Sequence, residues 1–385
     1  MKKIGCVLAF CNNYGTMLQS YATLKKIESL GNQCEIIRYS KRMSVCQKLM
    51  MLIRLLRIGE FSSQSRKVKR IANMKLYPSY KQNKAVKDNA FKRFSEEKLK
   101  PYFKEYIGYD ALKKGSLNYN LVLVGSDQIW SLVSLYGGYY NLMFVDDSVP
   151  KVSYASSFGV TVIPAFQQKA TKAYLDRMQM IGVREHSGKK IVDGLSENRA
   201  TVVADPTMLL SPEEWEAEIA NVKANKDKPY IFCYFLGKNK EHRRAAEKLK
   251  RLTGYEIVAV CHNDEYVKSD EEFGDDVPYD VGPLQFLRYI HDAAYVCTDS
   301  FHCSVFSILF KRQFVSFYRY QNGSKGSRNT RIDNLLGILH LSERVYNGDV
   351  SIAQRPINYK FVMERLADYR EESLRFLNKE LSLAK

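Results

Sequence analysis

The stretch from Ala294 to Phe310 contains the side chain best suited to acid-base chemistry, His302. Its residues 295–297 predict a short buried strand, 298–300 a polar turn, and the apolar residues of 302–310 a helix. A turn at the carboxyl end of a parallel strand points the N–H groups of the helix start toward an anionic ligand. An imidazole in the first helical turn can donate a hydrogen bond and exchange protons near neutral pH. The alternative is that His302 caps its own helix or fills a polar gap.

Polar turns also follow the strand-like runs in the first half of the chain. These turns are residues 11–15, 125–130, 156–159, 185–188 and 205–206. Because the carboxyl ends of parallel strands meet at one edge of a sheet, we expect the turns to line a common ligand crevice.

Three side chains in these turns or directly before one of them are candidates for ligand contact. The amide of Asn13 suits a hydroxyl-rich ligand, the guanidinium of Arg184 an anion, and the carboxylate of Asp127 a hydroxyl or a proton. Each has a structural alternative. Asn13 and Asp127 also favour turns, Arg184 can pair with Glu185 or Asp205, and Asp205 itself is interpreted as a structural turn residue.

Strands alternate with helices in two successive halves of the sequence. This order predicts an α/β protein with two doubly wound, Rossmann-like domains that face each other across a cleft. The first domain is expected over residues 1–206, with a basic helical insert at 41–105, and the second over 207–350. Residues 351–385 are expected to end in a helix that packs back on the first domain. The first predicted helix has Thr16 as its N-cap.

The composition is typical of a globular protein, with 45% hydrophobic and 26% charged residues in a chain of 385. We expect a cytoplasmic protein, because no apolar run reaches the 18 or so residues of a membrane span and no signal cleavage site follows the amino terminus.

The eight cysteines include no Cys-x-x-Cys pair and are interpreted as reduced core residues. The histidines show no metal spacing, so no metal is expected. A dinucleotide is not supported, because the sequence contains no Gly-x-Gly-x-x-Gly.

The net charge of +17 is concentrated in one segment. Residues 41–100 contain 17 lysines and arginines against 4 acidic residues, a net charge of +13. Such a cluster favours an anionic surface, either phospholipid headgroups or nucleic acid. Residues 44–58 predict a basic amphipathic helix with Arg54 and Arg57 away from its apolar face, as in an interfacial anchor. The alternative is a helix packed on the domain with its lysines solvated.

Taken together, the motifs resemble those of the polysaccharide pyruvyl transferase family. That family shows an Asn-Tyr-Gly loop after the first strand, a Gly-Ser-x-x-x-Trp turn, a Val-Arg-x-x-x-Ser segment before an Asp-Pro pair, and a Phe-His or Leu-His pair before an apolar helix. The corresponding residues here are Asn13-Tyr14-Gly15, Gly125-Ser126-Asp127-Gln128-Ile129-Trp130, Val183-Arg184-Glu185-His186-Ser187, Asp205-Pro206 and Ser300-Phe301-His302. They follow the family's order and spacing over roughly residues 4–336.

The resemblance implies a fold like that of the two-domain GT-B glycosyltransferases. It also implies phosphoenolpyruvate as donor and transfer of pyruvate, as a ketal, onto two hydroxyls of a sugar in a bacterial capsule or exopolysaccharide. Phosphoenolpyruvate is a co-substrate, and no cofactor is expected.

The resemblance further implies that Arg184 and His302 help to hold the donor. Many family members carry an arginine two residues before the histidine, where this chain has Ser300. One phosphate ligand is therefore either missing or supplied by another basic side chain. The candidates are Lys325, Arg328 and Arg331. The predicted donor site therefore consists of these three residues together with Arg184, Ser300 and His302.

Ketal formation needs a proton donor near the donor substrate and a base near the acceptor hydroxyls. We expect His302 to be a phosphate ligand and candidate acid, and Asp127 to be an acceptor ligand or base. Asn13, Tyr14 and Ser126 complete the predicted acceptor site, with core packing as the alternative for Tyr14.

The predicted acceptor is a lipid-linked sugar such as galactose, with residues 41–100 holding the enzyme at the anionic inner face of the plasma membrane. Two other functions fit parts of the sequence. A nucleotide-sugar glycosyltransferase would share the architecture, but it needs an acidic ribose site for which the sequence offers no clear candidate. A nucleic-acid-binding protein would use the basic segment and leave the crevice motifs unexplained, so no nucleic acid is expected.

Overall fold

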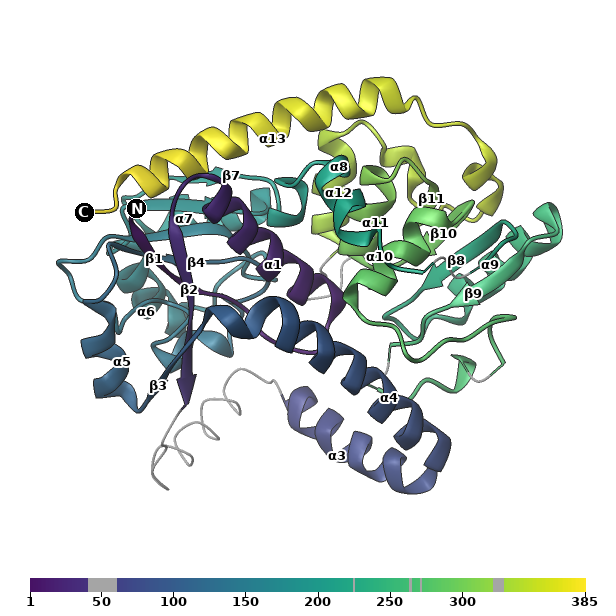
Figure 1. Cartoon of the computed structure of the whole chain (residues 1–385), viewed down its shortest axis with the longest axis horizontal. Coiled ribbons are helices and arrows are strands. Elements are labelled where there is room, and N and C mark those ends of the chain that lie inside the picture. The colour runs from purple at the N-terminus through teal and green to yellow at the C-terminus, as the bar shows by residue number, and fades with distance from the viewer. Residues whose placement is uncertain (41–60, 224–225, 263–264, 271, 321–328) are drawn as a thin grey trace.

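The structure is a computed structural model that describes the chain except for residues 41–60, 224–225, 263–264, 271 and 321–328 (Figure 1). The predicted amphipathic helix at 44–58, with Arg54 and Arg57, lies outside the described residues. So do two of the predicted donor ligands, Lys325 and Arg328.

Seven parallel strands of the described chain form the first sheet, in the order β3-β2-β1-β4-β5-β6-β7. The central strands β1, β4, β5 and β6 are buried over most of their length, as in a sheet covered on both faces, whereas β2, β3 and β7 are only partly buried. Helices α1 (Tyr14–Ser29), α5 (Tyr109–Ser116), α6 (Ala165–Leu175) and α7 (His186–Leu195) belong to this first lobe. The strands are β1 (Lys3–Val7), β2 (Gln33–Ser40), β3 (Phe103–Ile107), β4 (Leu121–Val124), β5 (Lys151–Ser156), β6 (Met180–Val183) and β7 (Ala200–Val202). The strand order reverses between β1 and β4, and ligands of such sheets bind at the carboxyl ends of the strands at this point.

The second lobe contains a smaller parallel sheet, in the order β11-β10-β8-β9. Here the order reverses between β8 and β10. The strands are β8 (Tyr230–Tyr234), β9 (Glu256–Ala259), β10 (Tyr295–Thr298) and β11 (Gln313–Ser316), and the helices are α8 (Pro212–Ile219), α9 (Lys240–Thr253), α10 (Pro283–Asp292), α11 (Phe301–Leu309) and α12 (Thr330–Ile338). The predicted fold class, two doubly wound α/β units, is confirmed.

Residues 61–94 of the basic insert form a pair of helices, α3 (Phe61–Leu76) and α4 (Pro78–Phe94), that extends from the first lobe along the second (Figure 1). Tyr77 stacks on Tyr266 of the second lobe with 4.1 Å between ring centroids. Arg93 pairs with Asp280, also in the second lobe. Helix α4 therefore bridges the lobes, and the membrane contact predicted for 41–100 stays a prediction.

The last helix, α13 (Tyr359–Ser382), runs from the second lobe across the first and brings the carboxyl terminus close to the amino terminus (Figure 1). Its Ser373 Oγ accepts a hydrogen bond from the N–H of Ala204 at 2.9 Å, and its Arg370 Nε donates to the carbonyl of Met208 at 2.7 Å. Two helices, α4 and α13, thus tie the lobes together. Among the described helices, none combines the length and apolar character needed to cross a bilayer.

Candidate active site

Helix α11 carries His302 from the second lobe to the first. Ser300 is its N-cap, and the Ser300 Oγ accepts from the N–H of Cys303 at 3.5 Å. His302 follows in the first helical turn, as predicted, and only 7% of the residue is exposed. Ser300 is therefore engaged in starting the helix.

Asp205, just after β7, joins the two lobes. Its Oδ1 accepts hydrogen bonds from the N–H and hydroxyl of Thr207, which is the predicted turn role. Its Oδ2 lies 2.9 Å from Arg184 Nη1, 3.3 Å from Ser126 Oγ and 3.5 Å from His302 Nε2. Burial alone would raise the pKa of Asp205, but the adjacent His302 and Arg184 hold that pKa well below its ordinary value. One ionised carboxylate thus contacts a guanidinium of the first lobe and an imidazole of the second.

Asp127, in the turn after β4, is the more accessible carboxylate, with 20% of its side chain exposed against 0% for Asp205. Its Oδ2 accepts from the Thr16 hydroxyl at 2.7 Å, and its Oδ1 lies 3.5 Å from Arg184 Nη2. Burial raises the pKa of Asp127, but the charges of Arg184 and His302 outweigh burial and leave that pKa lowered. A substrate entering here would meet an ionised carboxylate at the reversal point of the first sheet.

Glu185 behaves differently from the two aspartates. It is buried, its Oε1 accepts from the Ser157 hydroxyl at 2.8 Å, and its Oε2 lies 3.9 Å from Arg184 Nε. Burial raises the pKa of Glu185 even though Arg184 opposes the shift. The cluster therefore contains carboxyl groups of different proton affinity, an arrangement that can divide acid and base roles.

Two guanidinium groups from different lobes lie over the ring of Phe301. The Arg184 guanidinium is 4.9 Å from the ring centroid, and that of Arg331, on α12, is 5.9 Å away. Burial lowers the pKa of Arg331 to about 9, and the charge of Arg184 adds to the shift. Two cations near one ring would both be stabilised by an anion that binds beside them.

Gly15 ends the loop after β1 at a point where there is no room for a side chain. A Cβ on Gly15 would lie 1.9 Å from His302 Nδ1, so any side chain would collide with the imidazole. The Asn-Tyr-Gly and Phe-His motifs, far apart in sequence, therefore meet in space.

Several buried polar atoms around this cluster have no hydrogen-bond partner among the described residues. They are Arg184 Nε, Glu185 Oε2, His302 Nε2, Arg331 Nε and Asn334 Oδ1. Buried polar groups are normally satisfied by protein, water or ligand. Their concentration here is what a pocket for a polar ligand requires.

The structure brings Ser126, Asp127, Arg184, His302 and Arg331 together, as the predictions require, while their individual roles stay predictions. Two predicted acceptor residues lie elsewhere. Tyr14 is 1% exposed, stacks on Phe286 at 4.1 Å and donates its hydroxyl to the Val281 carbonyl, so the packing alternative describes its position. Asn13, and not Thr16, is the N-cap of α1: its Oδ1 accepts from the N–H of Thr16 at 3.3 Å.

The sequence interpretation missed Thr16, Glu185 and Phe301 as site residues and gave Asp205 only its turn role. Each of these residues is next to a predicted site residue or motif in the sequence. That adjacency was the only sequence feature that could have indicated them. In the part of the chain that the structure describes, no group of three or more His, Cys, Asp or Glu side chains could hold a metal ion.

The family model for polysaccharide pyruvyl transferase matches residues 13–322. A search of the curated proteins finds no match. Among solved structures, the chain is similar to the UDP-GlcNAc 2-epimerase from Methanocaldococcus jannaschii, with 12% identity, a TM-score of 0.51 and coverage of 95% of this chain and 92% of that one. UGT89C1 from Arabidopsis thaliana, complexed with UDP, matches with 9% identity, a TM-score of 0.51 and full coverage of both chains. At such identities these likenesses show the fold alone, a GT-B-like pair of lobes.

Proposed function

The chain belongs to the polysaccharide pyruvyl transferase family, whose members are transferases, and from this premise we propose that it uses phosphoenolpyruvate to place a pyruvate ketal on two hydroxyls of a sugar. The product would be part of a surface polysaccharide of a bacterium.

One observation carries the choice of donor: the half-buried Arg331 beside Arg184. Phosphoenolpyruvate has a phosphate and a carboxylate, so its pocket needs more than one cation. The Arg331 Nε has no hydrogen-bond partner among the described residues, and the charge of Arg319 reaches Arg331 as well. Arg331 can therefore supply the phosphate ligand that Ser300 does not provide.

The proposed reaction balances with two sugar hydroxyls. A proton adds to the methylene carbon of the donor, and the first hydroxyl forms a C–O bond to the neighbouring carbon as it loses its own proton. The bond to phosphate then breaks, and the second hydroxyl adds to the same carbon. Of the two hydroxyl protons, one ends on the new methyl group and the other on the released phosphate.

We assign the two proton transfers to two groups of the cluster. His302, held between Gly15 and Asp205, is our candidate for protonating the methylene carbon. Asp127, ionised and partly exposed, is our candidate for taking the hydroxyl proton, with the Thr16 hydroxyl fixing its orientation. Positioned acid-base groups of this kind contribute about 10²–10⁴ in rate.

The donor assignment is tested by thermal shift and phosphate release. We expect phosphoenolpyruvate to stabilise the protein and UDP-galactose and DNA to leave it unchanged, at both low and high salt. Arg331→Gln should abolish the shift, whereas Arg375→Gln, on the exposed face of α13, should retain it. Phosphate release with p-nitrophenyl glycosides then identifies the acceptor. Stabilisation by UDP-galactose alone would overturn the proposal in favour of a glycosyltransferase.

We also propose that the acceptor sugar is linked to a lipid and that the basic segment 41–100 keeps the enzyme at an anionic membrane surface on the cytoplasmic side. Lys81 and Lys92 on α4 are exposed and available for headgroup contact. Binding to vesicles containing phosphatidylserine should be strong at low salt and weak at high salt. Unchanged binding after replacement of Arg54 and Arg57 would contradict a role for residues 44–58.

A further inference from the structure

Helix α3 is the outer helix of the hairpin that the basic insert adds to the protein. Figure 1 shows α3 on the side of α4 that faces away from the two lobes. The turn between the helices is held against the second lobe, because Tyr77 stacks on Tyr266. Tyr80 of α4 meets the same Tyr266 ring edge-on, with 5.7 Å between centroids. Helix α3 therefore has a defined position relative to the second lobe.

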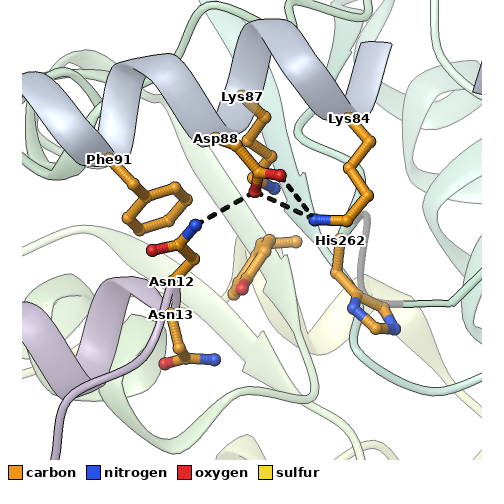
Figure 2. A pocket seen from close by; sticks show the side chains of 8 residues that line it. Asn12, Asn13, Lys84, Lys87, Asp88, Phe91 and His262 are labelled. Carbon is orange, nitrogen blue, oxygen red and sulfur yellow. Dashed lines mark hydrogen bonds and ion pairs between the residues drawn. The ribbon is translucent and has the colours of Figure 1, made fainter. Parts of the chain in front are cut away.

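The inner cations of α4 hold the hairpin to the rest of the protein. Figure 2 shows Lys84, Lys87 and Asp88 pointing from α4 toward the loop after β1 and toward His262 of the second lobe. Lys84 Nζ lies 2.8 Å from Asp88 Oδ2. The buried Lys87 donates a hydrogen bond to the carbonyl of Cys261. These ammonium groups are engaged within the protein, so cations that could meet an outside partner lie elsewhere on the hairpin.

The side chains in the second half of α3 divide into an outward and an inward group. Over residues 69–76, five side chains are exposed and three are partly buried. Because successive helical residues are about 100° apart, the exposed five fall within an arc of about 160°. They are Lys69, Ile71, Ala72, Lys75 and Leu76. This part of α3 therefore presents one continuous face to solvent.

This outward face combines positive charge with large aliphatic side chains. Ile71 and Leu76 are 57% and 69% exposed, although leaving such side chains in water is unfavourable. Residues 61–87 contain eight lysines and arginines and no aspartate or glutamate. Lys75 lies between Ile71 and Leu76 on the arc, so its stem can follow the apolar side chains while its ammonium reaches a charged group. Cations beside aliphatic side chains are typical of a helix that lies in the headgroup layer of an anionic membrane.

We propose that α3 lies in the surface of an anionic membrane, with Ile71 and Leu76 among the acyl chains and Lys69 and Lys75 at the headgroups. The inference rests on the membrane contact in the proposed function and assigns that contact to one face of one helix. A nucleic acid would match the charge, but its phosphate backbone offers no apolar layer for the two aliphatic side chains. Because α4 joins α3 to the second lobe, the contact also fixes which side of the enzyme faces the membrane.

Insertion is tested with Leu76→Trp in the full-length protein. The two natural tryptophans, Trp130 and Trp215, are fully buried, so the emission added by the substitution reports on position 76 alone. Vesicles of phosphatidylserine and phosphatidylcholine should shift the added emission to the blue. Val162→Trp, at a 70% exposed position of the first lobe, is the control and should show no shift. Emission that is already blue before vesicles are added would overturn the proposal, since another part of the chain would then cover this face.

Affinity is measured by co-sedimentation with the same vesicles. Leu76→Ser and Ile71→Ser should each weaken binding about tenfold, because each removes an aliphatic group from the apolar layer. The double change of Lys69→Gln and Lys75→Gln should weaken binding about 30-fold at low salt and much less at high salt. The matched controls are Val162→Ser and Lys169→Gln, both at exposed positions of the first lobe, and they should leave binding unchanged.

The outcomes separate this inference from the proposed function. Vesicle binding that is insensitive to Leu76→Ser and Ile71→Ser overturns the assignment to α3 and leaves a membrane contact elsewhere in residues 41–100. Binding to duplex DNA that the double lysine change abolishes, without a blue shift of Leu76→Trp on vesicles, would assign the face to nucleic acid instead. Absence of vesicle binding by the unmodified protein contradicts the membrane contact itself, whereas phosphate release tests the donor chemistry independently. Because every substituted side chain is exposed, thermal melts of the variants should match that of the unmodified protein and exclude misfolding.

Discussion

Two buried aspartates, one in each lobe, have similar neighbours and different surroundings. Asp205 follows β7 and Asp299 follows β10, and each lies near an arginine and a histidine. Asp299 Oδ1 and Oδ2 accept from the N–H groups of Leu236 and Gly237 at 2.6 and 2.8 Å. The carboxylate of Asp299 is thus occupied by the backbone of its own lobe.

Asp205 uses its two oxygens differently. Oδ1 holds the local turn, whereas Oδ2 meets only side chains, one of them from the opposite lobe. An aspartate with an arginine and a histidine beside it therefore stabilises a loop at Asp299, whereas the same three residue types at Asp205 connect the two lobes at the candidate active site. The difference lies in whether backbone amides or side chains of two lobes surround the carboxylate.

The largest effect is expected from His302→Asn. If His302 is the acid, kcat for phosphate release from phosphoenolpyruvate should fall by about 10³. His242→Asn, the matching change near Asp299, should alter kcat of the folded enzyme by less than about threefold, since no proton transfer is assigned to His242. Phosphate-release assays on both variants check this, and equal losses would remove the distinction between the two clusters.

Arg184→Lys is expected to lower kcat/KM for phosphoenolpyruvate by about 10², because lysine cannot reproduce the two-pronged contact of a guanidinium. Its control is Arg243→Lys, which changes the arginine paired with Asp270 in the second lobe. That control should cost stability without a specific loss of activity. An Arg184→Lys enzyme with normal kcat/KM would argue against donor binding at this residue.

Asp205→Asn and Asp299→Asn should both lower the free energy of unfolding at pH 7. The loss should be about 3 kcal/mol for Asp205→Asn, because the buried Arg184 is then less well paired. For Asp299→Asn it should be about 1–3 kcal/mol. Burial opposes ionisation of both, but their cationic neighbours lower the folded-state pKa of each. Their stabilisation is therefore complete above the unfolded pKa near 3.9 and is lost as the pH falls below it. Measured by urea unfolding, the free energy of unfolding should fall less steeply between pH 6 and pH 3 in both variants than in the unmodified protein. Only Asp205→Asn should also reduce turnover.

Gly15→Ala gives the smallest expected effect and the sharpest test of how the lobes meet. Overpacking against the His302 imidazole should cost about 1–3 kcal/mol. Combination with His302→Ala should recover most of that loss, because the colliding ring is gone. Gly194→Ala, at a position where a Cβ meets nothing within 4 Å, is the control. Additive losses in the double variant would show that the two residues are not in contact.

The sequence determined the fold class and many of the elements, because burial patterns and caps are local. The apolar run at 121–124 forms a strand, and Ser211 caps α8 with Pro212 at the first helical position. It also placed His302 in the first turn of α11. Helix α12 and the edge strand β3 were not predicted, since neither has a strong apolar period of its own.

Only the tertiary structure decided which of the candidate residues meet. Asp205 contacts His302 because the lobes dock, and no local pattern encodes a contact between residues so distant in the chain. The contact between the lobes also buries Tyr14 against Phe286 and brings Arg331 close to the same Phe301 ring as Arg184. A carboxylate's pKa depends on which charges surround it, so the chemistry of this site follows from the approach of the two sheets and could not be read from residue types alone.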